Sequence, residues 1–87
     1  MVNSMKLEVE IEPYDDGISV NYVDGSEIIC QQDGDAVLIK ANAEGLQQLA
    51  SICLTLAQND TPSGSHLHLD ESNFFEGGSL ELTIAKK

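Results

Sequence analysis

The stretch from Gly64 to Asp70 constrains the fold more than any other part of the chain. Its residues alternate strictly between apolar and polar, which is typical of a β-strand with one buried face. Leu67 and Leu69 are expected on the buried face, and the two histidines of the protein, His66 and His68, on the opposite face. Such a strand needs a second layer of structure to cover its leucines.

A helical pattern supplies that layer. Asn42 is a favourable N-cap residue, and Glu44 lies in the first turn, where a carboxylate stabilises the helix dipole. We expect one helix, Asn42–Gln58, with an apolar face on the sheet. The apolar positions are Leu46, Leu49, Ala50, Cys53 and Ala57, flanked by Ile52, Leu54 and Leu56. The polar positions fall largely between them: Gln47, Gln48, Ser51, Thr55 and Gln58.

Short alternating runs separated by Asp-Gly steps precede the helix. Asp-Gly favours tight turns, and the step occurs at residues 16–17, 24–25 and 33–34. We expect strands over residues 6–12, 18–22 and 36–41, while residues 27–31 form either a further strand or an irregular edge. Strands joined by such turns predict an antiparallel meander.

The last alternating run, Ser79–Ala85, completes a hairpin with the histidine strand. Opposed residues of an antiparallel pair point to the same face, and a slip of one residue would invert a whole face. The simplest register therefore sets Leu69 opposite Leu80, His68 opposite Glu81 and His66 opposite Thr83, with a slip of two residues as the alternative. We expect the helix to cover the leucine row of the hairpin. That row is Leu67, Leu69, Leu80, Leu82 and Ile84.

Together these elements predict one domain over residues 1–87, with residues 1–4 as a disordered lead. The predicted fold class is α+β: an antiparallel sheet of about five strands, made of an N-terminal meander and a C-terminal hairpin, with one α-helix packed on one face.

The charge balance narrows the possible partners. Fifteen acidic residues face four lysines and no arginine, so the formal net charge is −11 at pH 7. Such a chain is expected to bind neither nucleic acid nor an anionic membrane surface, because both need cationic side chains. A basic protein partner is favoured, because opposite charge speeds encounter. The alternative is that the acids only keep a small domain soluble.

The two cysteines do not form a disulfide framework, and Cys53 is expected to be a buried free thiol on the apolar helix face. The chain opens with no charged-then-apolar leader and contains no apolar run of membrane-spanning length. These features predict a soluble, cytoplasmic protein.

One polar cluster is expected on the sheet face away from the helix. Its members are His66, His68, Asp70, Ser79, Glu81 and Thr83. Two imidazoles with two carboxylates could hold a metal ion, although His-X-His alone is a weak signal and an open sheet face lacks the walls of a cavity. Acid–base catalysis by His68 with Glu81 or Asp70 is a second hypothesis, but no nucleophile motif or phosphate loop accompanies it. Cross-strand structural pairs and a protein-docking face are the remaining interpretations.

Three segments together resemble a known family. Residues 42–50 read Asn-Ala-Glu-Gly-Leu-Gln-Gln-Leu-Ala, residues 64–71 read Gly-Ser-His-Leu-His-Leu-Asp-Glu, and residues 78–84 read Gly-Ser-Leu-Glu-Leu-Thr-Ile. From Lys40 onward the chain resembles the immunity protein 32 family of bacterial polymorphic-toxin systems. The most specific parts are the His-X-His-Leu-Asp-Glu and Gly-Ser-X-Glu-Leu segments.

The resemblance implies a small α+β protein that is encoded beside a toxin and neutralises it by binding, without enzymatic activity or a cofactor. The acidity of the chain suits a basic toxin, such as a nuclease. The motif residues become candidates for partner binding: His66, His68, Asp70, Glu71, Ser79 and Glu81. A monomer and a homodimer, formed through an open sheet edge or the uncovered face, both remain open. The rival hypothesis is a small metal-binding or His/Glu-dependent enzyme that uses His66, His68, Asp70 and Glu81.

Overall fold

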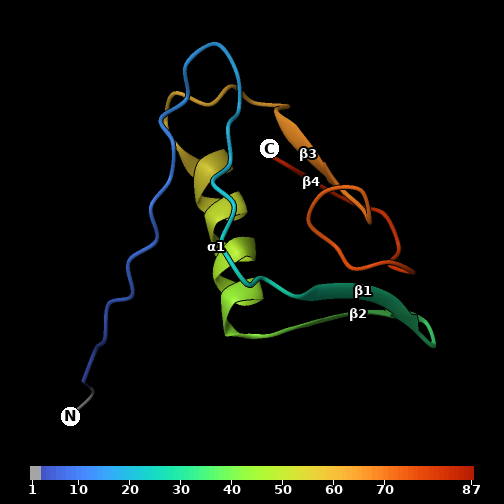
Figure 1. Ribbon diagram of the computed structural model, residues 1–87. Helices are drawn as coiled ribbons and strands as arrows, with labels where there is room; N and C mark the ends of the chain where they lie inside the picture. Colours follow the sequence, from blue (N-terminus) through green and yellow to red (C-terminus); the bar gives the residue numbers. More distant parts are fainter. Residues whose placement is uncertain (1–2) are drawn as a thin grey trace.

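The computed structural model describes residues 3–87 and places one helix beside two small antiparallel sheets (Figure 1). The first sheet pairs β1 (Ile28–Asp33) with β2 (Ala36–Ala41), and the second pairs β3 (His66–Leu69) with β4 (Leu82–Ala85). The helix α1 (Ala43–Ala57) lies between them in the sequence. The α+β class is therefore confirmed, but the prediction of one sheet of about five strands is wrong, because residues 3–87 form four strands in two sheets.

The β1–β2 hairpin turns at the Asp33-Gly34 step, as the sequence predicted. Asp33 pairs with Ala36, so the loop has two residues, and Gly34 takes a φ of +62°. A positive φ at the first loop position is the geometry of a type II′ turn, which favours glycine there. The ambiguous run at residues 27–31 forms most of β1.

Residues 3–27 form no strand, so the predicted strands over 6–12 and 18–22 are wrong. The edge of β1 that a meander would use is already occupied. The Glu76 N–H donates to the Ile28 carbonyl at 2.8 Å, and the Leu80 N–H donates to the Cys30 carbonyl at 2.7 Å. Residues 3–27 are called the N-terminal segment. This segment runs beside α1 without regular secondary structure and bends at residues 15–17 (Figure 1). The predicted disordered lead falls partly on residues 1 and 2, which lie outside the described residues.

The start of α1 is fixed by a side-chain cap and a close backbone approach. Asn42 Oδ1 accepts hydrogen bonds from the Gly45 N–H at 2.7 Å and the Glu27 N–H at 3.0 Å, which confirms Asn42 as the N-cap. At Gly45 a Cβ would lie 2.9 Å from both Ala41 Cβ and Ile28 Cγ1, and would also strike the Glu27 carbonyl. Glycine at this position therefore allows the hairpin to cross the first helical turn.

The buried face of α1 is partly polar, contrary to the sequence prediction. Gln48 and Ser51 are buried, whereas Leu46 is 54% exposed, Leu54 is 46% exposed and Cys53 is exposed. The reason is the irregular N-terminal segment. Its backbone lacks a strand partner, so it needs hydrogen bonds from side chains of the helix.

Gln48 supplies the central pair of these hydrogen bonds. Its Oε1 accepts from the Val23 N–H at 2.6 Å, and its Nε2 donates to the Asn21 carbonyl at 3.0 Å. Gln58, the C-cap residue of α1, makes the same kind of pair. Its Oε1 accepts from the Tyr14 N–H at 3.1 Å, and its Nε2 donates to the Glu12 carbonyl at 2.9 Å. Two glutamines therefore replace the missing strand partner.

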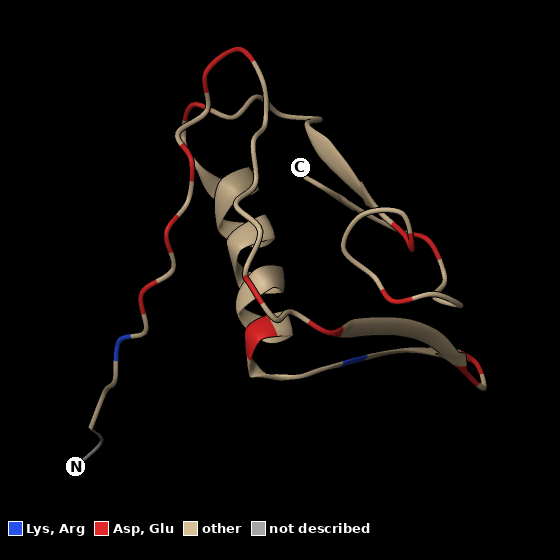
Figure 2. Ribbon diagram, in the orientation of Figure 1, with Lys and Arg blue, Asp and Glu red and all other residues tan. Residues whose placement is uncertain are grey.

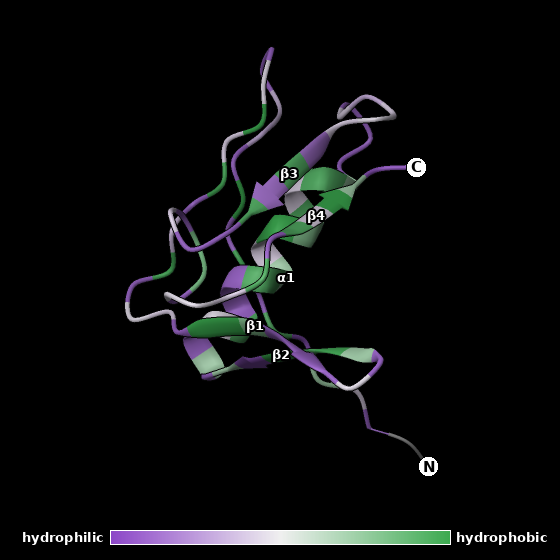
Figure 3. Ribbon diagram, turned by 90° about the vertical axis from the view of Figure 1, so that its right-hand side faces the viewer, coloured by the Kyte–Doolittle hydropathy of each residue, from purple (hydrophilic) through white to green (hydrophobic). Residues whose placement is uncertain are grey.

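The core lies where α1, β1 and β3 meet the loop between β3 and β4, and Figure 3 shows apolar residues (green) on α1, β1 and β4. Its buried members are Ile28, Cys30, Ile52, Leu69 and Phe75. Three of the predicted hairpin residues, Leu67, Leu82 and Ile84, pack against it, but Leu80 is 41% exposed. Among residues 3–87, no helix combines the length and the apolar character needed to cross a membrane.

Candidate functional site

The β3–β4 hairpin adopts the alternative register, two residues away from the simplest one. His68 lies opposite Thr83, His66 opposite Ala85 and Leu69 opposite Leu82. The simplest register, which set these residues opposite Glu81, Thr83 and Leu80, is therefore wrong. The prediction that the leucines of both strands share one face is confirmed, because Leu67 lies opposite Ile84 and Leu69 opposite Leu82. Residues 79–80 cannot extend β4, since their polar groups bond to β1.

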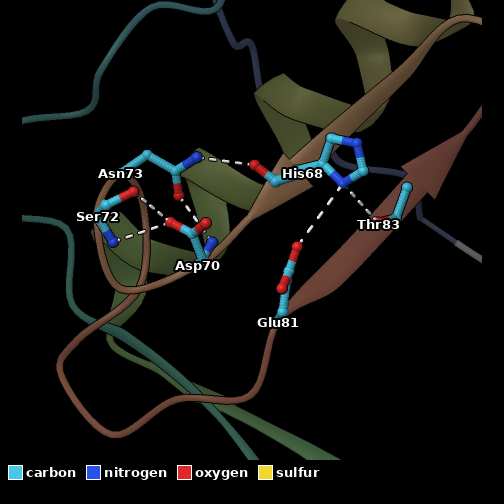
Figure 4. Close-up of polar contacts among 6 residues, drawn as sticks. All are labelled: His68, Asp70, Ser72, Asn73, Glu81 and Thr83. Carbon is cyan, nitrogen blue, oxygen red and sulfur yellow. Dashed lines mark hydrogen bonds and ion pairs between the residues drawn. The ribbon is translucent and has the colours of Figure 1, made fainter.

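The exposed face of this hairpin carries a small polar group around His68 (Figure 4). His68 Nδ1 lies 3.0 Å from Thr83 Oγ1, and 3.9 Å from Glu81 Oε1. The side chains of His68 and Glu81 are 58% and 68% exposed, so water screens their attraction. The ring of His66 meets that of His68 edge-on, with centroids 5.0 Å apart. This arrangement offers hydrogen-bonding groups to a partner but no enclosed cavity.

Asp70 does not join the histidines but shapes the loop that follows β3. Its Oδ1 accepts hydrogen bonds from the Ser72 N–H at 2.9 Å and from the Ser72 hydroxyl at 2.6 Å (Figure 4). The Ser72 hydroxyl, then the Ser72 N–H, and to a smaller extent nearby His68 lower the pKa of the Asp70 carboxyl below its ordinary value. Asn73 closes the same loop, donating from Nδ2 to the His68 carbonyl at 2.7 Å.

Glu71 and Ser79 also have contacts within the fold. Glu71 Oε2 accepts from the Gly78 N–H at 2.9 Å, and Ser79 Oγ accepts from the Cys30 N–H at 3.2 Å. The six candidate residues therefore divide into two sets. His66, His68 and Glu81 lie on the exposed hairpin face, while Asp70, Glu71 and Ser79 hold the loop and attach it to β1.

No set of three or more His, Cys, Asp and Glu side chains within residues 3–87 is arranged to hold a metal ion. The carboxylate of Asp70 is directed to Ser72, so it does not complete a ligand set with the two histidines.

Two hollows beside residues 7–12 were not anticipated from the sequence. The first, of about 470 Å³, is lined mainly by apolar side chains, including Leu7, Val9, Leu46, Ala50 and Leu54. The second, of about 500 Å³, is lined by acidic and polar side chains, including Glu8, Glu10, Glu12 and Tyr22. A sequence signal existed, because apolar residues surround more of the helix than one sheet face requires.

Comparison with protein families gives a match to the part of the chain that carries the β3–β4 hairpin. The family model described as immunity protein 32 matches residues 36–87, which is more than half of the chain. The chain belongs to the immunity protein 32 family. The resemblance seen from Lys40 onward is thus confirmed. Comparison with curated proteins and with solved structures gave no match.

The match to immunity protein 32 covers β2, α1, β3 and β4, and with them all six motif candidates. The N-terminal segment and β1 precede the matched region. Family membership therefore accounts for the hairpin motif but not for the segment that borders the two hollows.

Proposed function

We propose that this immunity protein neutralises a cognate toxin by binding to it and covering the surface that the toxin needs for its activity. The family match over residues 36–87 carries this proposal. The surface chemistry supports it, because the exposed apolar side chains can form the apolar centre of an interface, and the surrounding carboxylates can steer a partner of opposite charge.

The charge of the chain favours a basic toxin. Fifteen acidic residues against four lysines produce a field that attracts a cationic surface, and acidic residues recur along most of the chain (Figure 2). Such attraction mainly raises the association rate and weakens as salt screens it. We therefore expect association to slow markedly between low and physiological ionic strength.

The exposed hairpin residues His66, His68 and Glu81 supply one candidate contact with the toxin. They are exposed and contact mainly one another and their hairpin neighbours, whereas Asp70, Glu71 and Ser79 act on the loop. In this proposal inhibition needs no chemical step by the immunity protein, because binding alone blocks the toxin.

Co-expression with the product of the adjacent gene tests the proposed function. The toxic gene is induced in cells with and without the immunity protein, and growth and co-purification are both measured. Rescue together with a stable complex is the expected result. Failure of rescue and of co-purification with the product of either flanking gene would refute the proposal. Rescue without a complex would refute neutralisation by binding.

A further inference from the structure

The first part of the N-terminal segment, Met5–Ile11, has the pattern of a strand but pairs with no strand among residues 3–87. It is extended, and no hydrogen bond joins its backbone to another residue within residues 3–87. Met5 and Leu7, which share the apolar side of this alternating segment, are both 84% exposed. A free strand edge with exposed apolar side chains is a template for pairing with another chain.

An apolar groove separates this segment from α1. Leu7 and Val9 form one wall, while Leu46, Ala50 and Leu54 form the other, around a volume of about 470 Å³. Leu46 and Leu54 are half exposed, so the groove has apolar walls that nothing within residues 3–87 covers. A groove of this kind accommodates the apolar side chains of a strand that pairs with the segment.

The polar side of the same segment is acidic. Glu8, Glu10 and Glu12 occur at every second position and line the neighbouring hollow of about 500 Å³. Lys6 is the one cation of this run, at its beginning. An occupant with lysine or arginine at alternate positions would set cations against these glutamates, and opposite charges across a strand pair are stabilising.

We propose that the groove between Met5–Ile11 and α1 is the docking site for an extended, basic segment of the partner protein, which adds to Met5–Ile11 as a β-strand. Its apolar side chains enter between Leu7 and Leu46, and its cations meet the glutamates. This inference rests on the proposed function and names the place and the chemistry of the contact. The N-terminal wall lies outside the matched residues 36–87, so family membership does not by itself specify this partner.

A second copy of the chain fits the groove less well. Two fully overlapping antiparallel Met5–Ile11 segments are centred on Glu8, so the two Glu8 side chains would lie directly opposite each other, and the favourable pairs would be Lys6 with Glu10. A register centred on Val9 would set each Glu8 opposite Glu10, and like charges directly opposite are destabilising. Each copy also carries a net charge of −11, which opposes association of two identical chains.

Two pairs of variants test the site against the product of the adjacent gene, with the dissociation constant measured by calorimetry. Leu46→Ser with Leu54→Ser removes the apolar wall, and its control is Val37→Ser, a residue on β2 that is 59% exposed. Glu8→Gln with Glu10→Gln removes two charges from the acidic side of Met5–Ile11, and its control is Asp33→Asn with Asp35→Asn at the β1–β2 turn. Both charge variants have the same net charge, so they separate the local contact from the overall field.

We expect each groove variant to weaken binding about tenfold or more, and each control about twofold or less. Circular dichroism should show that all four variants fold, since their side chains are at least partly exposed. If wild type binds and the groove variants bind like their controls, the docking site is wrong while the proposed function stands. If light scattering shows a dimer that Leu46→Ser with Leu54→Ser dissociates, a second copy occupies the groove and the assignment is overturned.

If the wild-type protein does not bind the product of the adjacent gene, the proposed function fails. The docking site is then tested separately with a peptide. A synthetic peptide of alternating valine and lysine is titrated into the labelled protein, and amide shifts are followed by NMR. A peptide of alternating valine and glutamate is the control. Amide shifts at residues 6–11 and 46–54 that occur with the lysine peptide and not with this control would support the docking site. Unmoved amides there would overturn it.

Discussion

Gln48 is the residue at which the sequence pattern and the structure make opposite predictions. The pattern places it on the polar, solvent-facing side of the helix, where replacement by an apolar residue has little effect. In the structure it is fully buried and holds the N-terminal segment. Gln48→Met keeps the length and approximate volume of the side chain, so it removes the polar contacts without creating a cavity.

The expected loss follows from the contacts of the amide group. Gln48 bonds to the Val23 N–H, the Asn21 carbonyl and the Ser51 hydroxyl. A net contribution of about 0.5–1.5 kcal/mol for each of these three hydrogen bonds gives a loss of about 1.5–4.5 kcal/mol. We expect about 2 kcal/mol, because the released segment can bond to water once it leaves the helix. For a domain of this size that is a large share of a total stability of about 5–10 kcal/mol.

Urea denaturation measures the loss, and amide hydrogen exchange locates it. The midpoint should fall by roughly 1 M or more, and the Val23 amide should lose its protection before the amides of β1. Gln47→Met is the matched control, because the neighbouring glutamine is exposed. If the two variants agree within about 0.5 kcal/mol, the proposed role of Gln48 in holding the N-terminal segment is refuted.

Gly45→Ala should destabilise the protein by about 1–2 kcal/mol in thermal unfolding, because crowding of the hairpin against the new Cβ exceeds the gain in helix propensity; an increase in stability would contradict the close approach. Leu69→Ala should lower the free energy of unfolding by about 2–5 kcal/mol, since Leu69 is fully buried, while Leu80→Ala, at a 41% exposed position, should cost much less; equal losses would disprove the assigned core. The lowered pKa of Asp70 implies stabilisation that is complete above the ordinary carboxyl value of 3.8 and disappears as pH falls through the lower folded-state value. In Asp70→Asn the free energy of unfolding should therefore fall less steeply with decreasing pH below about pH 4. The same dependence on pH as in the wild-type protein would argue against the Ser72 contact.

Local signals in the sequence predicted the elements that are local in origin. Asn42 as a helix cap and the Asp33-Gly34 turn depend on neighbouring residues alone, and both are confirmed. The shared face of Leu67 and Leu69 with Leu82 and Ile84 follows from strand parity, which survives a slip of two residues.

The candidate site was predicted as one cluster and is found as two sets. Alternation placed His66 and His68 on one exposed face, as observed. It could not show that Asp70 turns toward Ser72 or that Ser79 bonds to β1, because these contacts depend on the path of the loop. The same loop fills the free edge of β1 and thereby leaves the N-terminal segment without a strand partner.

The helix, the Asp33-Gly34 turn, the shared leucine face of the C-terminal hairpin, the acidic charge and the family could all be read from the sequence. The tertiary structure decided which face of the helix is buried and which strands pair. Helical and strand periodicity record how residues are arranged along one element, whereas pairing depends on which chain segment the tertiary packing places beside an open strand edge. Gln48 is buried and Leu46 is exposed for that reason: the helix must satisfy a backbone that has no strand beside it.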